Sequence, residues 1–192
     1  MLGLVNRSIE VFLRTTYGEK VWKEIAARAD VDARGFNSLR HYADETTTRL
    51  LRCAATTLKK TTLEILEDTG SWMVRLEPIR RLLRFSGGEF AEFIDALEEL
   101  PARARMALPD LVFPPLTVTQ KEGGIYDVQG HGWPFGLQWI VAGVLRGMAD
   151  DYGVLALIEA DADGIEIRIL EEEFALGRPF DLAPAPSESI AL

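Results

Sequence analysis

The sequence contains a single cysteine, Cys53, among its 192 residues. One cysteine excludes an intramolecular disulfide and suits a reducing compartment, so we expect a cytoplasmic protein. Positive charge is also scarce, because 21 lysines and arginines face 30 aspartates and glutamates and leave a net charge of −9. This balance argues against non-specific binding to nucleic acid or to an anionic membrane, both of which favour a basic surface.

Long hydrophobic runs are absent as well. The longest is FGLQWIVAGVL, residues 135–145, which is too short to span a bilayer as a helix and is more typical of a buried helix. The N-terminal apolar run is interrupted by Arg7 and Glu10 and has no cleavage-like site, so it does not read as a signal peptide. We therefore predict no membrane association.

The N-terminal half of the chain shows helical periodicity. Apolar residues make up 47% of the sequence, enough for a core, and the length suits one domain. Apolar side chains recur at spacings of three and four residues, which predicts successive amphipathic helices. Asp44 is placed to cap one of them, a threonine to begin the next, and Gly87–Gly88 to end the one after. The expected helices are 3–14, a second restarting at Gly18, YADETTTRLLRCAATTLKK, TTLEILEDTGSWMVRL continuing toward Leu76, EPIRRLLRF, and 88 to about 108.

After Pro114 and Pro115 the pattern becomes strand-like. Alternating runs flank Gly123–Gly124, and two more flank the turn DADG at 161–164, so each pair predicts a β-hairpin. A helix over residues 135–150 separates the two hairpins.

Helices followed by antiparallel hairpins predict an α+β fold, in which a helical N-terminal half packs on a small antiparallel sheet with an inserted helix. We assign residues 1–180 to this domain and residues 181–192 to a flexible C-terminal tail.

One residue conflicts with the helix expected over 88–108. Its apolar face consists of Phe90, Phe93, Ile94, Leu97 and Leu100. Pro101 follows Leu97 by four residues and so belongs to the same face. Proline lacks an N–H and clashes with the carbonyl four residues earlier, which costs ~3 kcal/mol inside a helix. We therefore predict a kink near residues 97–101.

Several strings, in order and at near-constant spacing, resemble the heme nitric oxide/oxygen binding family, the H-NOX domain of soluble guanylate cyclases and bacterial gas sensors. The opening MLGLVNRSIEVFLRTTYGEKVWKEI resembles the family pattern M-x-G-x-V-N, an acidic residue four positions on, and Y-G-x-x-V-W. FIDALEEL is similar to the segment leading to the heme-ligand helix, and ALPDLVFPP to the loop after it. GLQWIVAGVLRGMADDYG is similar to the helix after the first hairpin. The resemblance covers roughly residues 1–172 and implies an H-NOX-like fold.

The resemblance implies a heme cofactor, yet two family features that hold heme are missing. The iron-binding histidine falls at Pro101, and the Tyr-x-Ser-x-Arg motif that clamps the propionates falls on Gly130, Gly132 and Pro134. Proline cannot ligate iron, and these side chains offer no donors to carboxylates that are costly to bury unpaired. We therefore expect no heme binding in the family manner, although Pro114 stands at the family's porphyrin-contact position.

Other residues are weaker candidates for a heme ligand. Histidine is a common axial ligand, and His131, in GHGW beside the missing clamp, is the alternative that its position favours. His41 is more typical of a surface or capping position. Cys53 fits a predicted helix core as a small apolar residue, and nothing specific supports Tyr126 or Tyr152.

No other motif points to chemistry. The run Glu171–Glu173 fits a solvated strand end better than a metal site, and the DADG turn lacks the downstream glutamate of an EF-hand. We find no nucleophile–base pair, phosphate-binding loop or cluster of metal ligands, so we expect no enzyme activity and no metal site.

Three functional hypotheses remain. The first is a stand-alone sensory module without heme, which docks on a signalling partner; the resemblance implies a histidine kinase or a cyclic-di-GMP enzyme. The second is a heme-based NO sensor with a non-standard ligand such as His131. The third is a binder of another apolar ligand in the vestigial heme pocket, which requires that the pocket be open.

Overall fold

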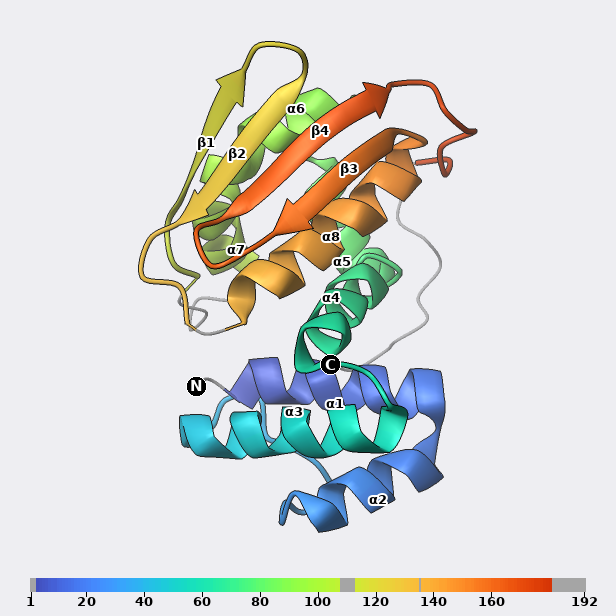
Figure 1. Cartoon of the computed structure of the whole chain (residues 1–192), viewed down its shortest axis with the longest axis vertical. Helices are drawn as coiled ribbons and strands as arrows, with labels where there is room; N and C mark the ends of the chain where they lie inside the picture. The colour runs from blue at the N-terminus through green and yellow to red at the C-terminus, as the bar shows by residue number, and fades with distance from the viewer. Residues whose placement is uncertain (1–2, 108–112, 135, 181–192) are drawn as a thin grey trace.

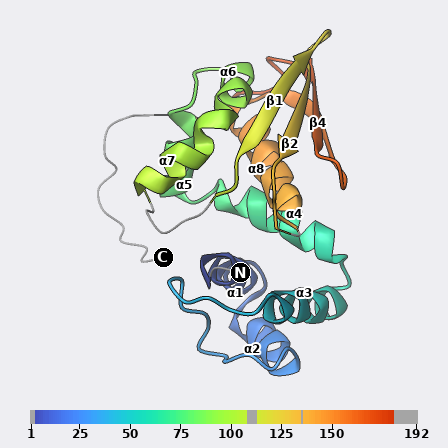
Figure 2. The same cartoon turned by 90° about the vertical axis from the view of Figure 1, so that its left-hand side faces the viewer.

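The chain folds into two lobes that share a central helix (Figures 1 and 2). The computed structural model describes residues 3–107, 113–134 and 136–180. The helices labelled α1, α2 and α3 form the lower lobe of Figure 1, with α4 packed on them, and a four-stranded sheet with helices behind it forms the upper lobe. Helix α4 lies between the lobes in both views. This arrangement confirms the predicted α+β fold class.

The helical lobe is built from amphipathic helices around one apolar core. Ile9, Phe12 and Leu13 of α1 are buried there, together with Trp22 of α2 and Leu50 of α3. The helices are α1 (Gly3–Tyr17), α2 (Glu19–Arg28), α3 (Asp44–Leu58) and α4 (Thr62–Met73).

Two helix starts test the predicted caps. The threonine before α4 is Thr61, whose hydroxyl accepts the Glu64 N–H at 3.1 Å while the Glu64 carboxylate accepts the Thr61 N–H at 2.6 Å. This capping box confirms the predicted start. The predicted cap of α3 is wrong, because the extended residue before the helix is Ala43 and no side chain caps it. Asp44 is instead the first helical residue, where its charge favours the helix dipole.

The long helix predicted over residues 88–108 is three shorter elements. They are α6 (Phe90–Asp95), the 3₁₀ turn η1 (Ala96–Glu99) and α7 (Leu100–Ala107). Pro101 is the second residue of α7, where a missing backbone N–H leaves no helical hydrogen bond unmade. The predicted kink is confirmed, and it places the proline where its ring favours the helix instead of breaking it.

The sheet joins the two predicted hairpins, both of which are confirmed. The strands are β1 (Leu116–Lys121), β2 (Ile125–Gly130), β3 (Leu155–Ala160) and β4 (Ile165–Glu171). Their order is β1-β2-β4-β3 with antiparallel neighbours, and the pairing of Tyr126 with Ile167 lies at the junction of the hairpins. Tyr126, Val128, Ile158 and Ile167 face the core, as the alternation of a half-buried sheet requires.

The helix predicted over 135–150 is α8 (Leu137–Tyr152), which covers the inner face of the sheet and contacts α4. Glycines permit an unusually close crossing with α4. A Cβ atom at Gly70 would lie 2.0 Å from the carbonyl oxygen of Ile140, and one at Gly143 would lie 2.0 Å from that of Glu67. The Ser71 hydroxyl also donates to the Gly143 carbonyl at 2.9 Å. The two lobes are therefore joined backbone to backbone.

The end of the described chain follows β4 without regular structure to Phe180. The tail predicted over 181–192 lies outside the described residues. Over the part of the chain that is described, no helix combines the length and the apolar character needed to cross a membrane.

Candidate functional site

The position expected for an iron ligand is buried but has no group that binds iron. Pro101 is buried at the start of α7. Residues 90–107, which form α6, η1 and α7, contain no histidine, cysteine or tyrosine. This stretch therefore supplies no histidine, cysteine or tyrosine ligand for heme iron, and its one methionine, Met106, is 86% exposed.

The positions expected for the propionate clamp lie at the end of β2 and in the loop before α8. The side chain of Trp133 packs directly on Gly130, because a Cβ atom at Gly130 would lie 2.0 Å from the indole ring. The indole N–H donates to the Pro115 carbonyl at 3.2 Å, and Phe113 packs edge-on against the ring. Trp133 thus takes the space that a larger side chain at residue 130 would occupy.

The remaining predicted site residues do not converge. His131 is exposed, and its Nε2 lies 3.2 Å from the Thr117 hydroxyl on β1. Pro114 is half-buried in the segment before β1. His41 is exposed, and Cys53 is half-buried on α3.

A small apolar pocket marks the boundary of the two lobes beside Pro134. Side chains from α1, α3, α4 and α8 line it: Val5, Ile9, Thr47, Leu51, Leu66, Leu137 and Ile140. Its volume is about 20 Å³. Pockets for ligands of cofactor size hold roughly 300–1,000 Å³, so this space is more than tenfold too small. Among the described residues that line it, Pro134 is the one predicted clamp position and Thr47 the one polar side chain.

The residues present at this place therefore do not fit a heme. Among the described residues, α6–α7 supplies no histidine, cysteine or tyrosine at the predicted ligand position, and the pocket that Pro134 lines offers no cation for the propionates and is too small for a porphyrin. Ile9 and Leu66, which line this pocket, are buried.

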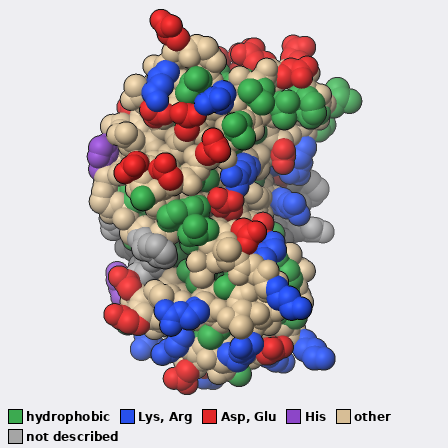
Figure 3. All heavy atoms as spheres, in the orientation of Figure 1, with side chains coloured by type: hydrophobic (Ala, Val, Ile, Leu, Met, Phe, Trp, Pro, Cys, Tyr) green, Lys and Arg blue, Asp and Glu red, His purple; other side chains and the backbone are tan. Residues whose placement is uncertain are grey.

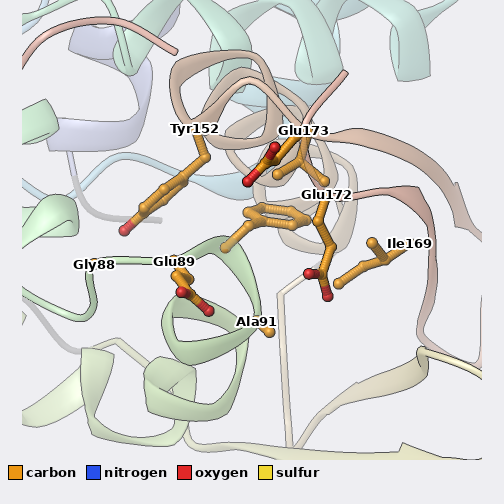
Figure 4. A pocket seen from close by; sticks show the side chains of 9 residues that line it. Gly88, Glu89, Ala91, Tyr152, Ile169, Glu172 and Glu173 are labelled. Carbon is orange, nitrogen blue, oxygen red and sulfur yellow. The ribbon is translucent and has the colours of Figure 1, made fainter. Parts of the chain in front are cut away.

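A second pocket lies at the opposite end of the sheet lobe, where α6, the end of α8 and the end of β4 meet (Figure 4). Its volume is about 150 Å³. Phe90 and Tyr152 form its aromatic part, with ring centroids 6.0 Å apart. The carboxylates of Glu89, Glu172 and Glu173 surround it from both sides.

Tyr152 is held in place by its hydroxyl and by its ring. The hydroxyl donates to the Gly87 carbonyl at 2.7 Å, and the Arg84 guanidinium lies 3.9 Å from the ring centroid. Burial raises the pKa of the Tyr152 phenol above its usual value, and the nearby Arg84 opposes only part of this effect. The tyrosine is therefore a neutral, fixed wall of the pocket at physiological pH.

A buried ion cluster next to this pocket was missed by the sequence analysis. Arg80 on α5 (Glu77–Arg84) and Asp151 on α8 are almost completely buried and pair at 2.7 Å. Arg80 also donates to the carbonyls of Arg178 and Pro179, which ties the last described residues to α5. The signal in the sequence is weak: an arginine directly beside the inward-facing Ile79.

Within the described ranges, no three histidine, cysteine, aspartate or glutamate side chains are placed to hold a metal ion.

Comparison with known proteins places these observations in a family. A model of the family described as haem-NO-binding matches residues 2–159. An H-NOX protein from S. oneidensis, a mutant in the Fe(II) ligation state, has a similar structure with a TM-score of 0.75 and 15% identity. The similarity covers 90% of this chain and 98% of that one.

Two further solved structures are similar. An unliganded Fe(II) H-NOX mutant from K. algicida has a TM-score of 0.73 at 14% identity, over 89% of this chain and 97% of that one. An oxygen-binding H-NOX domain related to soluble guanylate cyclases has a TM-score of 0.67 at 15% identity, over 93% of this chain and 100% of that one. At such identities the structural likeness shows the fold, and the family match over most of the sequence shows that this chain belongs to the haem-NO-binding (H-NOX) family.

Proposed function

We propose that this chain is a sensory or signalling module of the H-NOX family that works without heme bound in the family manner and acts by docking on a partner protein. The observation that carries the proposal is the pocket of about 20 Å³ at the lobe boundary, beside Pro134. A porphyrin needs far more space than this pocket offers, and apolar side chains of both lobes line it.

The chemistry of the missing ligands supports the same proposal. Pro101 offers no lone pair to iron, and its position early in α7 makes it a favourable residue for the helix start. Gly130 is covered by Trp133, so the loop that would carry the clamp is packed against itself. Ligand, clamp and volume are three independent requirements, and each is unmet.

The output of such a module is a protein contact. The proposal assigns no catalytic step to the chain, and it takes from the family resemblance a partner of the histidine kinase or cyclic-di-GMP enzyme class. Gas sensing is then an ancestral property of the fold, and the stimulus acts through the partner or through a surface of this chain.

An absorption spectrum with and without added hemin tests the absence of heme. We expect a colourless protein with no Soret band, and the same result for Pro101→His, because restoring the ligand does not open the pocket. A Soret band in Pro101→His alone would show that the boundary opens easily. A band in the unchanged protein that is lost in His131→Ala would overturn the proposal in favour of a heme sensor with His131 as ligand.

Partner docking needs its own measurement. The full chain, purified, is titrated by calorimetry against purified histidine kinases and cyclic-di-GMP enzymes of its own organism. We expect saturable binding to one of them and a change in that partner's activity. Absence of binding across the whole set would contradict the docking proposal while leaving the heme result unaffected.

A further inference from the structure

We propose that the pocket between α6, the end of α8 and the end of β4 receives a lysine or arginine side chain of a partner protein. This inference rests on the docking function proposed above and assigns it a surface and a chemistry. The pocket lies on the sheet lobe, away from the boundary between the lobes, because α6 and the end of β4 are at the top of Figure 1.

The size of the pocket suits one inserted side chain better than a small-molecule ligand. Its volume of about 150 Å³ is about half of the roughly 300 Å³ at which pockets for small-molecule ligands begin. Its inner surface is apolar, with Ala91, Val154 and Ile169 beside the aromatic pair Phe90 and Tyr152. Such a surface suits the methylene stem of a lysine or arginine, which packs on apolar groups while its charged end remains near water.

The negative charges around the opening of the pocket favour the binding of a cation. Among the described residues, Glu89, Glu172 and Glu173 have no lysine or arginine as an ion-pair partner. The Glu89 carboxylate accepts only the backbone N–H of Glu92, so its charge stays uncompensated. Three carboxylates around one opening repel each other, and a cation between them relieves that repulsion.

Three arginines near the pocket, Arg80, Arg84 and Arg178, share the buried Asp151 carboxylate at 2.7, 3.6 and 3.7 Å. The Arg84 guanidinium also occupies a face of Tyr152. The face of the Phe90 ring adds the attraction of an aromatic quadrupole for a further cation. Among the described residues these arginines make no ion pair with the glutamates at the opening, whose carboxylates therefore remain available to a cation.

The surroundings of the pocket point to a protein as the source of that cation. Leu170 and Phe174 are each 58% exposed and Leu176 is fully exposed, all within seven residues along the chain end that carries Glu172 and Glu173. Figure 3 shows apolar and acidic side chains gathered together over this end of β4. A patch of this kind fits a partner segment in which a basic residue stands among apolar ones.

The charge of the whole chain is complementary to such a segment. Residues 1–60 hold 11 lysines and arginines against 7 aspartates and glutamates, a net charge of +4. Residues 61–192 hold 10 against 23, a net charge of −13. The negative potential is therefore concentrated on the part of the chain that contains the pocket, where it steers a basic partner toward this face.

The test is a titration of the ¹⁵N-labelled full chain with two capped tripeptides, acetyl-Leu-Lys-Leu-amide and acetyl-Leu-norleucine-Leu-amide. They differ only in the terminal ammonium. We expect the lysine peptide to shift the amide signals of Ala91, Val154 and Ile169, and the norleucine peptide to shift them far less. The affinity for the lysine peptide should fall with added salt.

Three variants locate the site. The double variant Glu172→Gln/Glu173→Gln should weaken lysine-peptide binding about three- to tenfold, the effect of losing two exposed ion pairs. Glu159→Gln removes a charge from exposed β3 outside the pocket and should change binding by less than about twofold. Ala91→Met fills the pocket without changing charge and should weaken binding as much as the double variant. Circular dichroism confirms the fold of each.

Each result supports or overturns the proposal. Equal shifts with both peptides, or equal weakening by Glu159→Gln and by the double variant, would show diffuse attraction to an acidic surface and overturn the pocket. Unchanged binding in Ala91→Met would do the same. A Soret band in the hemin experiment would overturn the heme-free function and leave the peptide result standing, so the two failures are distinguishable.

Discussion

A proline on the buried face of a helix is unfavourable only if the helix continues through it. At Pro101 it does not, because the 3₁₀ turn over Ala96–Glu99 ends one helix and α7 begins at Leu100. In the first turn of a helix the ring of proline matches the required φ and no hydrogen bond is lost. The proline at the predicted iron-ligand position therefore stabilises the local chain path that replaces the predicted long helix.

Asp151 and Arg80 are the residues for which we expect the largest effect of a single substitution. Asp151→Ala removes the buried carboxylate from Arg80, whose side chain is 5% exposed, and leaves it only the more exposed Glu77 carboxylate at 3.5 Å. We expect a loss of about 3–5 kcal/mol in the free energy of unfolding, measured by urea denaturation.

The matched control is Glu166→Ala, which breaks the exposed pair with Arg168 and should cost at most about 1 kcal/mol. Equal effects for the two substitutions would show that the Arg80–Asp151 pair is replaced by water when broken and contributes no more than a surface pair.

At the scale of elements, the crossing of α4 and α8 decides how the lobes are held. Gly70 and Gly143 bring each helix within contact of the other's backbone, and Arg146 of α8 reaches across to Glu67 of α4 and to the Ile158 carbonyl of β3. One helix pair thus links the helical lobe to the sheet. A close crossing leaves little space between the lobes, which agrees with the small pocket beside Pro134.

Gly143→Ala tests the crossing. Its new Cβ atom would lie 2.0 Å from the Glu67 carbonyl oxygen, which belongs to backbone and cannot turn away. We expect the helices to separate and the free energy of unfolding to fall by about 1–3 kcal/mol, despite the higher helix propensity of alanine.

Gly147→Ala is the control on the same helix, because its Cβ atom would lie 3.0 Å from the Val74 side chain and 3.3 Å from the Ser71 carbonyl oxygen, contacts that are tight but far longer than the 2.0 Å overlap at Gly143. A stabilised Gly143→Ala protein would contradict the close crossing of the helices.

At the scale of the whole molecule, two hydrophobic cores are connected through helix α4. One core lies among α1–α4 and the other between α8, α6 and the sheet. Because α4 contributes Ile65 and Leu66 to the first core and also packs on α8, unfolding of either core removes support from the other.

We therefore expect a single cooperative thermal transition. Calorimetric and van't Hoff enthalpies should agree for the unchanged chain, as for a two-state protein. In Gly143→Ala the calorimetric enthalpy should exceed the van't Hoff value as the lobes begin to unfold separately. Two resolved transitions in the unchanged chain would contradict the coupled unfolding of the two cores.

Much of the secondary structure could be predicted from local pattern. The threonine cap at Thr61, the turns at Gly123–Gly124 and DADG, and the kink at Pro101 all depend on neighbours a few residues apart, which a sequence displays directly. The N-cap predicted at Asp44 was wrong by one residue. The residue before the helix is Ala43, and its extended backbone depends on the loop that leads into the helix.

The candidate sites were less accessible to prediction. That Pro101 replaces an iron ligand and that the clamp is missing are predictions from residue types matched to the family pattern, and they stay predictions here. The acidic pocket joins Glu89 to Glu172 and Glu173, which lie more than 80 positions further along the chain. These glutamates come close together because α6 packs against the end of β4, and no local sequence pattern predicts this packing.

The sequence by itself determined the elements, the family, and the prediction that the groups that bind heme are missing, because periodicity, turn residues and ligand chemistry are local properties. Only the tertiary structure decided that the pocket beside Pro134 is small, that Arg80 is buried against Asp151, and that three carboxylates surround one aromatic pocket. Cavity volume, burial and the sum of nearby charges depend on which distant segments meet, and that is set by packing.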